Sequence, residues 1–291
     1  MLVTMQSLLA EAKKGRYAVG GFNCATLENI RAAVAAAEAL DAPVILEYAE
    51  AHEQWIPLAE IGPIMLDYAR RARVPVAVHL DHGTTYARFV EAIRLGFTSV
   101  MVDASALPFD ENVARTQEIV KLAHSVGVTV EAELGHVFNS SIGAAKGAVA
   151  DAEEEHEDLD AIYTDPALAK AFVEQTQVDC LAIAFGTVHG VYLSEPKLDL
   201  PRVARIRDAV GIPLVMHGGS GVKPEDYRTA IQNGICKINY YTYVNQDGGE
   251  AVRRHVENGG DRVFFDAVSA VATEAMQKHY EEAIALFRAR D

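Results

Sequence analysis

Three histidines in this chain lie just after short runs of apolar, β-branched residues. His82 lies two residues after the run VAVHL, His189 follows LAIAF and a short turn, and His217 follows LVM. Three neutral imidazoles that leave one coordination position open are typical of a catalytic zinc ion. If these runs are strands that end at one place, the three residues predict a metal site there.

Carboxylates accompany the histidines in the same pattern. Asp103 and Glu133 end two more apolar runs, where they could orient the imidazole rings or hold a second, shifted position of the ion. Asp81 directly precedes His82, which makes it a candidate acid and base for a nearby hydroxyl, with a helix cap or a partner of a metal ligand as the alternative. Because open-site Zn²⁺ polarises a carbonyl or stabilises an enediolate, these residues predict metal-assisted carbonyl chemistry.

Small residues suited to phosphate binding follow the last two apolar runs. Gly218-Gly219-Ser220-Gly221 follows His217, Asn239 to Thr242 follows the final run, and Gly190 follows His189. In α/β barrels the loops after strands seven and eight bind phosphate through backbone N–H groups and a hydroxyl. A tight turn alone would also explain the glycines, but their location favours a phosphate site. The residues therefore predict a metal-dependent lyase or isomerase that acts on a phosphorylated carbonyl compound.

The elements that must position these residues alternate along the chain. Helix signals such as Thr26, Thr85 and Gly96 stand between apolar runs typical of buried parallel strands. The runs lie near residues 18–22, 44–48, 76–80, 99–103, 129–134, 180–185, 213–217 and 236–239. This alternation predicts an α/β fold, a single-domain (β/α)8 TIM barrel over residues 1–291, with its chemistry at the carboxyl ends of the strands.

Two additions to this barrel and one alternative fold also follow from the pattern. We expect a long mobile loop at about 136–160 and a long C-terminal helix at about 264–290. A doubly wound open sheet is the alternative, but its G-x-G-x-x-G fingerprint is absent after the first run.

Composition excludes several classes of protein. The chain has 291 residues, with 26 Lys plus Arg against 41 Asp plus Glu, and a formal net charge of −15 disfavours nucleic-acid binding. No apolar stretch is long enough to span a bilayer, and the N-terminus lacks the charge order of a secretory signal. The cysteines, Cys24, Cys180 and Cys236, are few and far apart. We therefore expect a cytoplasmic protein without nucleic-acid or membrane partners.

These motifs resemble the class II, metal-dependent ketose-bisphosphate aldolases, which include fructose- and tagatose-bisphosphate aldolases. The resemblance covers nearly the whole chain, in the family's order and at compatible spacing. Its strings are GFN at 21–23, PVAVHLDHG at 75–83, VEAELG at 130–135, YTDP at 163–166, AIAFGTVHGVY at 182–192, HGGSG at 217–221 and KIN at 237–239.

The resemblance implies a zinc-dependent lyase that reversibly cleaves a ketose 1-phosphate or 1,6-bisphosphate to dihydroxyacetone phosphate and an aldehyde, through a metal-stabilised enediolate. It implies zinc on His82, His189 and His217, an alternative or buried metal position at Asp103 and Glu133, and proton transfer by Asp81. The phosphate of dihydroxyacetone phosphate would be bound by Gly190, Gly218, Gly219, Ser220, Asn239 and Thr242. A monovalent cation (Na⁺ or K⁺) near that phosphate and a homodimer or homotetramer are also implied. A metal-dependent sugar-phosphate epimerase or isomerase, and a non-catalytic sugar-phosphate-binding protein, remain alternatives.

The chain departs from the family in the half of the site that faces the aldehyde. Tyr241 and Tyr243 replace the two aspartates of the family's N-x-D-T-D string, and Leu193 stands where a lysine often follows HGVY. The acidic run Tyr48-Ala49-Glu50-Ala51-His52-Glu53 replaces a serine that helps to bind the distal phosphate. Negative charge there disfavours a second phosphate.

A further departure concerns the family's loop glutamate, which exchanges a proton at the nascent carbanion. Direct alignment from Glu133 gives Ser140 and Ser141, which cannot do so at neutral pH. The candidates for that role are Glu153, Glu154, Glu155, Glu157 and His136. We interpret the remaining histidines as surface residues: His52, His124, His156, His255 and His279.

Overall fold

Eight parallel strands close into a barrel in the computed structural model of the chain, which describes all residues except 141–161, 193–194, 260–261 and 289–291. The barrel strands are β1 (Val19–Asn23), β2 (Val44–Ala49), β3 (Val76–Gly83), β4 (Ser99–Val102), β5 (Thr129–Leu134), β7 (Cys180–Ile183), β9 (Leu214–Met216) and β10 (Ile235–Tyr240). Around the barrel their order is β1-β10-β9-β7-β5-β4-β3-β2, and every neighbouring pair is parallel. The predicted TIM barrel and its eight strands are confirmed.

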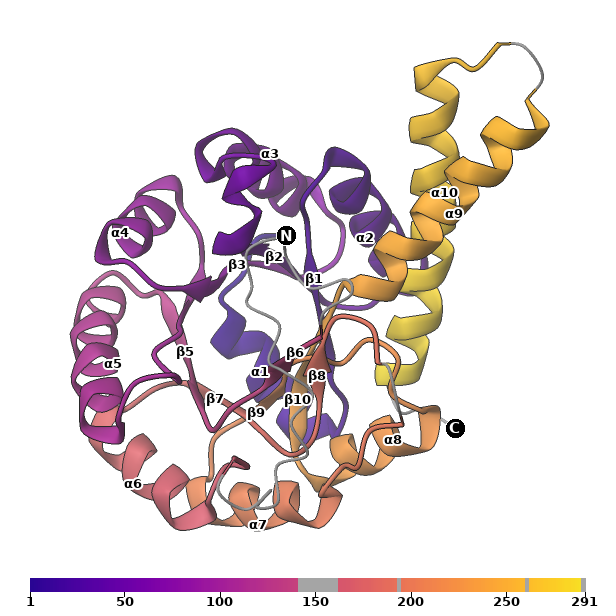
Figure 1. Cartoon of the computed structure of the whole chain (residues 1–291). Coiled ribbons are helices and arrows are strands. Elements are labelled where there is room, and N and C mark those ends of the chain that lie inside the picture. The colour runs from indigo at the N-terminus through magenta and orange to yellow at the C-terminus, as the bar shows by residue number, and fades with distance from the viewer. Residues whose placement is uncertain (141–161, 193–194, 260–261, 289–291) are drawn as a thin grey trace.

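Helices surround the strands in a ring (Figure 1). The helices are α1 (Met5–Gly15), α2 (Leu27–Ala39), η1 (Glu50–Gln54, a 3₁₀ helix), α3 (Leu58–Arg71), α4 (Tyr86–Leu95), α5 (Phe109–His124), α6 (Pro166–Thr176), α7 (Leu200–Val210), α8 (Pro224–Asn233), α9 (Thr242–Asn258) and α10 (Phe265–Phe287). Local signals set several boundaries. The Thr26 and Thr85 side chains accept hydrogen bonds from the first turns of α2 and α4, and Gly96 ends α4 with a left-handed backbone.

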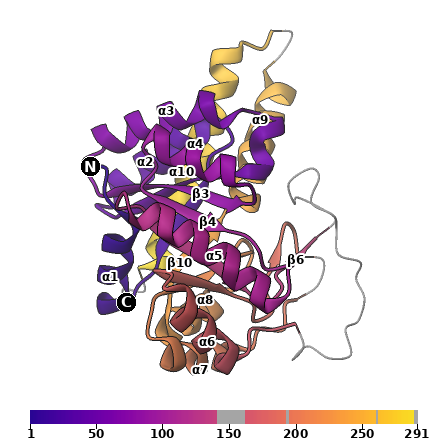
Figure 2. The same cartoon turned by 90° about the vertical axis from the view of Figure 1, so that its left-hand side faces the viewer.

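The two ends of the barrel are closed differently. Helix α1 packs Met5 and Leu9 against interior residues of the strands, among them Val19 and Ile45, and so fills the amino-terminal end. A short parallel pair, β6 (Phe138–Asn139) with β8 (Val188–His189), lies at the opposite end (Figure 2). The carboxyl end of the barrel is therefore the open end, where a pocket can form.

The C-terminal helices extend beyond the ring. Helices α9 and α10 lie side by side and project away from the barrel (Figures 1 and 2). Helix α10 occupies residues 265–287 of the segment at 264–290 where a long helix is expected, whereas α9 has no counterpart in the sequence-based prediction. The predicted loop at about 136–160 lies largely outside the described residues. Among the described helices, none has the length and apolarity to cross a membrane.

Candidate active site

The three predicted metal-binding histidines meet at the carboxyl end of the barrel. Each of His82, His189 and His217 offers a ring nitrogen that lies within 4.8 Å of the other two. His82 Nε2 and His217 Nδ1 are 3.0 Å apart, and the buried Nε2 of His189 has no hydrogen-bond partner among the described residues. Tetrahedral zinc with Zn–N bonds of about 2.0–2.1 Å separates its ligand atoms by about 3.4 Å, so the nitrogens of His82 and His217 would bind such an ion after moving slightly apart.

An irregularity at the end of β3 brings two consecutive residues into the site. In a regular strand Asp81 and His82 would point to opposite faces. The register of β3 against β4 shifts between Leu80 and Gly83, and His82 has a φ of 48°, in the left-handed region. A bulge of this kind redirects side chains, so the carboxylate and the imidazole both reach the pocket.

The other two histidines are positioned by contacts between strand ends. His189 lies in β8, whose carbonyl at position 189 accepts a hydrogen bond from the Ser140 N–H at 2.8 Å. His217 follows β9 and is fully buried. The next residue, Gly218, has a φ of 62°, and a Cβ there would lie 2.5 Å from the Val188 carbonyl oxygen. Only glycine permits this approach, which brings the β8 and β9 ends together.

Two carboxylates hold the outer nitrogens of the metal-site rings. Asp103 Oδ2 lies 2.7 Å from His82 Nδ1, and Glu131 Oε1 lies 2.8 Å from His217 Nε2. Glu133 instead lies on the inner side: its Oε2 is 3.4 Å from His217 Nδ1, and this oxygen has no hydrogen-bond partner among the described residues. Of the two predicted carboxylates, Asp103 thus orients a ring and Glu133 faces the position where an ion fits. The roles of Asp103 and Glu133 at a metal position remain predictions.

Glu131 was not among the predicted site residues. The sequence does contain a signal for Glu131, because it lies two residues before Glu133 in the same strand. Alternate residues of a strand point to the same face, so Glu131 must point to the same face as Glu133. Burial would raise the pKa of Glu131, but the Lys237 ammonium and the His217 hydrogen bond outweigh burial and lower this pKa to about 2. Glu131 is therefore a carboxylate that fixes the orientation of a metal-site imidazole.

Replacing Glu131 by glutamine is expected to weaken zinc binding about 10- to 100-fold, because partners of metal ligands have effects of that size. Competition with a fluorescent chelator measures the zinc dissociation constant. Glu47→Gln is the matched control, since Glu47 also lies 2.8 Å from Lys237 Nζ but contacts none of the three histidines. Equal zinc affinities for Glu131→Gln and the unmodified protein would contradict this role.

A charged cluster lies in the barrel interior beneath the histidines. Lys237 Nζ is 2.8 Å from both Glu47 Oε1 and Glu131 Oε2, and all three side chains are fully buried. Gly21 makes room for this cluster, because a Cβ there would lie 2.4 Å from Glu47 Oε1. Ligand atoms of Glu47, His79 and Asp81 also come together here, but the Lys237 ammonium already supplies positive charge at this place.

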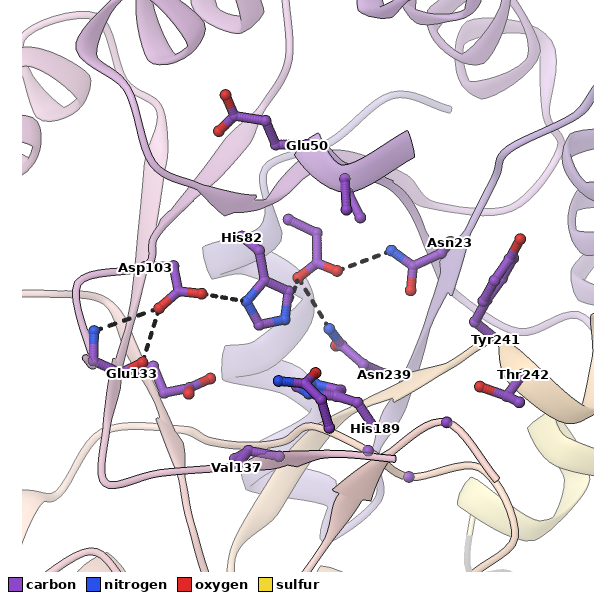
Figure 3. A pocket seen from close by; sticks show the side chains of 18 of the residues that line it. Asn23, Glu50, His82, Asp103, Glu133, Val137, His189, Asn239, Tyr241 and Thr242 are labelled. Atoms are coloured by element: carbon purple, nitrogen blue, oxygen red, sulfur yellow. Dashed lines mark hydrogen bonds and ion pairs between the residues drawn. The ribbon is translucent and has the colours of Figure 1, made fainter. Parts of the chain in front are cut away.

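Asp81 is held as an ionised group at the centre of the pocket. Asn23 Nδ2 donates to its Oδ2 at 2.9 Å and Asn239 Nδ2 donates to its Oδ1 at 3.1 Å, from two sides (Figure 3). Burial alone would raise the pKa of Asp81, but the nearby His82, His217 and Lys237 outweigh it and hold this pKa well below its usual range. The carboxylate is therefore ionised at neutral pH.

The pocket above these residues encloses about 630 Å³, a volume suited to a small phosphorylated metabolite. Its wall contains all six of the residues predicted to bind phosphate: Gly190, Gly218, Gly219, Ser220, Asn239 and Thr242. Thr242 is also the first residue of α9, whose amino-terminal end therefore faces the pocket. His136 lies at the same wall, whereas the candidates Glu153, Glu154, Glu155 and Glu157, with Ser141 and Leu193, lie outside the described residues.

The interpretation of His52 as a surface residue is wrong. His52 lines the pocket with only 2% of its surface exposed, stacks on Trp55 at 5.2 Å between ring centroids and lies 5.1 Å from the Tyr241 ring. Burial lowers the pKa of His52 to about 4. The short η1 helix turns this side chain inward, which a pattern of alternating residue types does not reveal.

The buried His52 makes stability depend on pH. Between about pH 6.5 and 4 the unfolded chain binds a proton here and the folded protein does not, so unfolding is favoured as the pH falls. The free energy of unfolding should fall by about 1.4 kcal/mol per pH unit from this group alone. Urea titrations at several pH values across this range measure how steeply the free energy of unfolding changes with pH. This pH dependence should be smaller by one proton in His52→Phe and unchanged in Trp55→Phe. An unaltered slope in His52→Phe would contradict the assignment.

Together, the barrel, the histidine cluster and the pocket are typical of barrel enzymes that use a metal ion. The sequence matches the family Fructose-bisphosphate aldolase class-II over residues 3–291. A protein named fructose-bisphosphate aldolase from Geobacillus stearothermophilus is 43% identical over 246 residues, which are 83% of this chain and 81% of that protein. A probable fructose-bisphosphate aldolase from Bacillus subtilis is 42% identical over 87% of this chain and 85% of its own length.

Solved structures agree with this match. The YdjI aldolase from Escherichia coli superposes with a TM-score of 0.85 at 35% identity, covering 99% of this chain and 97% of that one. The chain therefore belongs to the class II fructose-bisphosphate aldolase family. It is a lyase of carbohydrate metabolism, and its family is generally metal-dependent.

Proposed function

We propose that this protein is a zinc-dependent aldolase that reversibly cleaves a phosphorylated ketose to dihydroxyacetone phosphate and an aldehyde. The observation that carries the proposal is the arrangement of three groups in one pocket. The histidine nitrogens, including the unpartnered Nε2 of His189, lie beside the ionised Asp81 and beside the glycine-rich loop after β9. The names of the relatives support a ketose bisphosphate as one substrate.

The proposed phosphate subsite uses backbone groups rather than a lysine or arginine. The amino-terminal end of α9 at Thr242 carries the positive end of the helix dipole, and the left-handed backbone of Gly190 and Gly218 allows a phosphate to approach closely. Ser220, whose hydroxyl accepts a hydrogen bond from Tyr241 N at 3.0 Å, fixes the loop beside it. A monovalent cation at this phosphate is part of the proposal.

Asp81 performs the proton transfer at the aldehyde side in this proposal. As the bond between the two halves of the ketose breaks, the hydroxyl on the carbon that becomes the aldehyde loses its proton to Asp81. Asn23 and Asn239 keep the carboxylate pointed at that hydroxyl. His82, His189 and His217 would hold the zinc ion, which would supply Lewis-acid polarisation of the ketose carbonyl and stabilise the negative charge that develops there.

Release of triose phosphate tests the proposal. Ketose 1-phosphates and 1,6-bisphosphates are incubated with the protein, with EDTA, and with EDTA followed by excess zinc, and triose phosphate is measured by a coupled dehydrogenase assay. We expect release that EDTA abolishes and zinc restores. An isomerase would instead change the sugar without producing a triose. Stoichiometric zinc without triose phosphate from any of these sugars would refute the aldolase proposal.

A homodimer or homotetramer is also part of the proposal. Three neighbouring apolar residues lie exposed just before and at the start of α10: Val263 at 43%, Phe264 at 65% and Phe265 at 83%. Exposed apolar patches of this kind mark contacts between proteins. The mass in solution, measured by light scattering after gel filtration, tests it directly. Cytoplasmic location remains a prediction from the sequence.

A further inference from the structure

Four carboxylates give the pocket wall negative charge. Glu50, Asp81, Asp103 and Glu133 line the pocket, and no lysine or arginine is among the described residues that do so. Figure 3 shows Glu50 across the pocket from His189, with His82 between them. Since His189 adjoins the proposed phosphate subsite at Gly190, Glu50 faces the opposite end of a bound ketose.

Glu50 is fixed in this position by its neighbours. Its Oε2 accepts hydrogen bonds from the Thr84 N–H at 2.7 Å and from the Thr84 hydroxyl at 3.1 Å. Thr84 itself lines the pocket, and only 19% of the Glu50 side chain is exposed. A carboxylate held by two donors cannot easily turn away from a second anion.

The nearest cation, Arg88, is already neutralised. Its guanidinium lies 3.6 Å from Glu50 Oε1, 3.1 Å from Glu53 Oε2 and 2.8 Å from Glu91 Oε2. Three carboxylates thus surround one positive charge, which leaves this region net negative. Arg88 does not line the pocket.

Aromatic rings line the pocket from η1, which begins at Glu50, to Tyr241, which precedes Thr242. The Tyr241 ring lies 5.1 Å from His52, which stacks on Trp55, and both Tyr241 and His52 line the pocket. Burial keeps His52 neutral at physiological pH, so it adds no positive charge. Flat rings beside a carboxylate suit the C–H faces and hydroxyl groups of an uncharged sugar chain.

We infer that the distal subsite, formed by Glu50, Thr84, His52 and Tyr241, selects an aldehyde that carries no phosphate, so that the preferred substrate is a ketose 1-phosphate. The inference rests on the aldolase proposal and narrows its substrate class. Attraction comes from the hydroxyl-binding carboxylate and the aromatic rings, and discrimination comes from repulsion between Glu50 and a second phosphate.

Matched sugars test this selection. The zinc-loaded protein is assayed with fructose 1-phosphate against fructose 1,6-bisphosphate, and with the corresponding tagatose pair. We expect kcat/KM to favour the monophosphate of each pair by about tenfold or more, because Glu50 and a second phosphate carry like charges that repel each other. Equal values, or a preference for the bisphosphates, would overturn the inference while leaving the aldolase proposal intact.

Variants identify the residue responsible. Glu50→Gln should raise the ratio of kcat/KM for the bisphosphate to kcat/KM for the monophosphate about tenfold. Glu91→Gln is the matched control, because it removes another carboxylate from Arg88 without changing the pocket wall. An equal gain in Glu91→Gln would assign the effect to a freed Arg88 and overturn the role of Glu50.

Measuring sugar binding without turnover tests the distal subsite independently of the proposed aldolase reaction. Isothermal titration of the zinc-loaded Asp81→Asn protein measures the affinity for each sugar without turnover. Tighter binding of the monophosphates supports the inference even if the unmodified protein releases no triose phosphate, an outcome that would refute the reaction alone. Tighter binding of the bisphosphates overturns the inference whatever the turnover.

Discussion

Replacing Asp81 by asparagine is expected to lower kcat for triose phosphate release by about 10²- to 10⁴-fold, the usual contribution of a positioned acid or base. Asparagine keeps the size of the side chain but cannot accept the hydroxyl proton. Asn23 and Asn239 hold the native carboxylate by their amide N–H groups, so the residue is built to accept and not to donate. Steady-state kinetics with the best ketose phosphate measures the effect.

Measurements of zinc content and sugar affinity distinguish a loss of proton transfer in Asp81→Asn from a general disruption of the site. Asp81→Asn should bind one equivalent of zinc and should bind the ketose phosphate within a few-fold of the unmodified protein. Asp165→Asn serves as the matched control, because Asp165 caps α6 away from the pocket and asparagine caps helices equally well. Undiminished kcat in Asp81→Asn would remove Asp81 from the mechanism.

Replacing Lys237 by methionine is expected to lower the free energy of unfolding by about 3–5 kcal/mol, since one partner of a buried ion pair is lost. The substitution preserves most of the side-chain volume but leaves Glu47 and Glu131 facing each other without a cation. Burial would lower the pKa of Lys237, but the two carboxylates outweigh burial and raise this pKa, because they stabilise the charged ammonium group. Urea unfolding in EDTA measures the loss without a contribution from metal binding.

Two comparisons make this result specific to the buried cluster. Lys170→Met removes an exposed partner, 57% accessible and 3.8 Å from Glu174, and should cost less than about 1 kcal/mol. The double variant Glu47→Gln/Lys237→Met should recover part of the loss, because burial already raises the pKa of Glu47 to about 8 and without Lys237 its carboxyl group has no charged partner. If the single and double variants lose the same stability, repulsion between the carboxylates is not the cause.

The sequence alone determined the barrel, because its signals are local. A strand buried on both faces is mostly apolar, as in VILEY and VAVHL, and a helix that follows Thr26 or Thr85 needs a side chain to cap its first turn. Once parallel strands are known, their carboxyl ends must meet. The convergence of His82, His189 and His217 therefore followed from the same reasoning.

The tertiary structure alone decided which partner each site residue has. Glu131 contacts His217 from 86 residues away and Lys237 from 106, and these pairings depend on which side chains share a level inside the barrel. The bulge that turns both Asp81 and His82 into the pocket, and the short helix that buries His52, break the alternation on which prediction rests. Patterns along the chain report burial and period, whereas contacts across a barrel are set by register and packing, and no local signal encodes them.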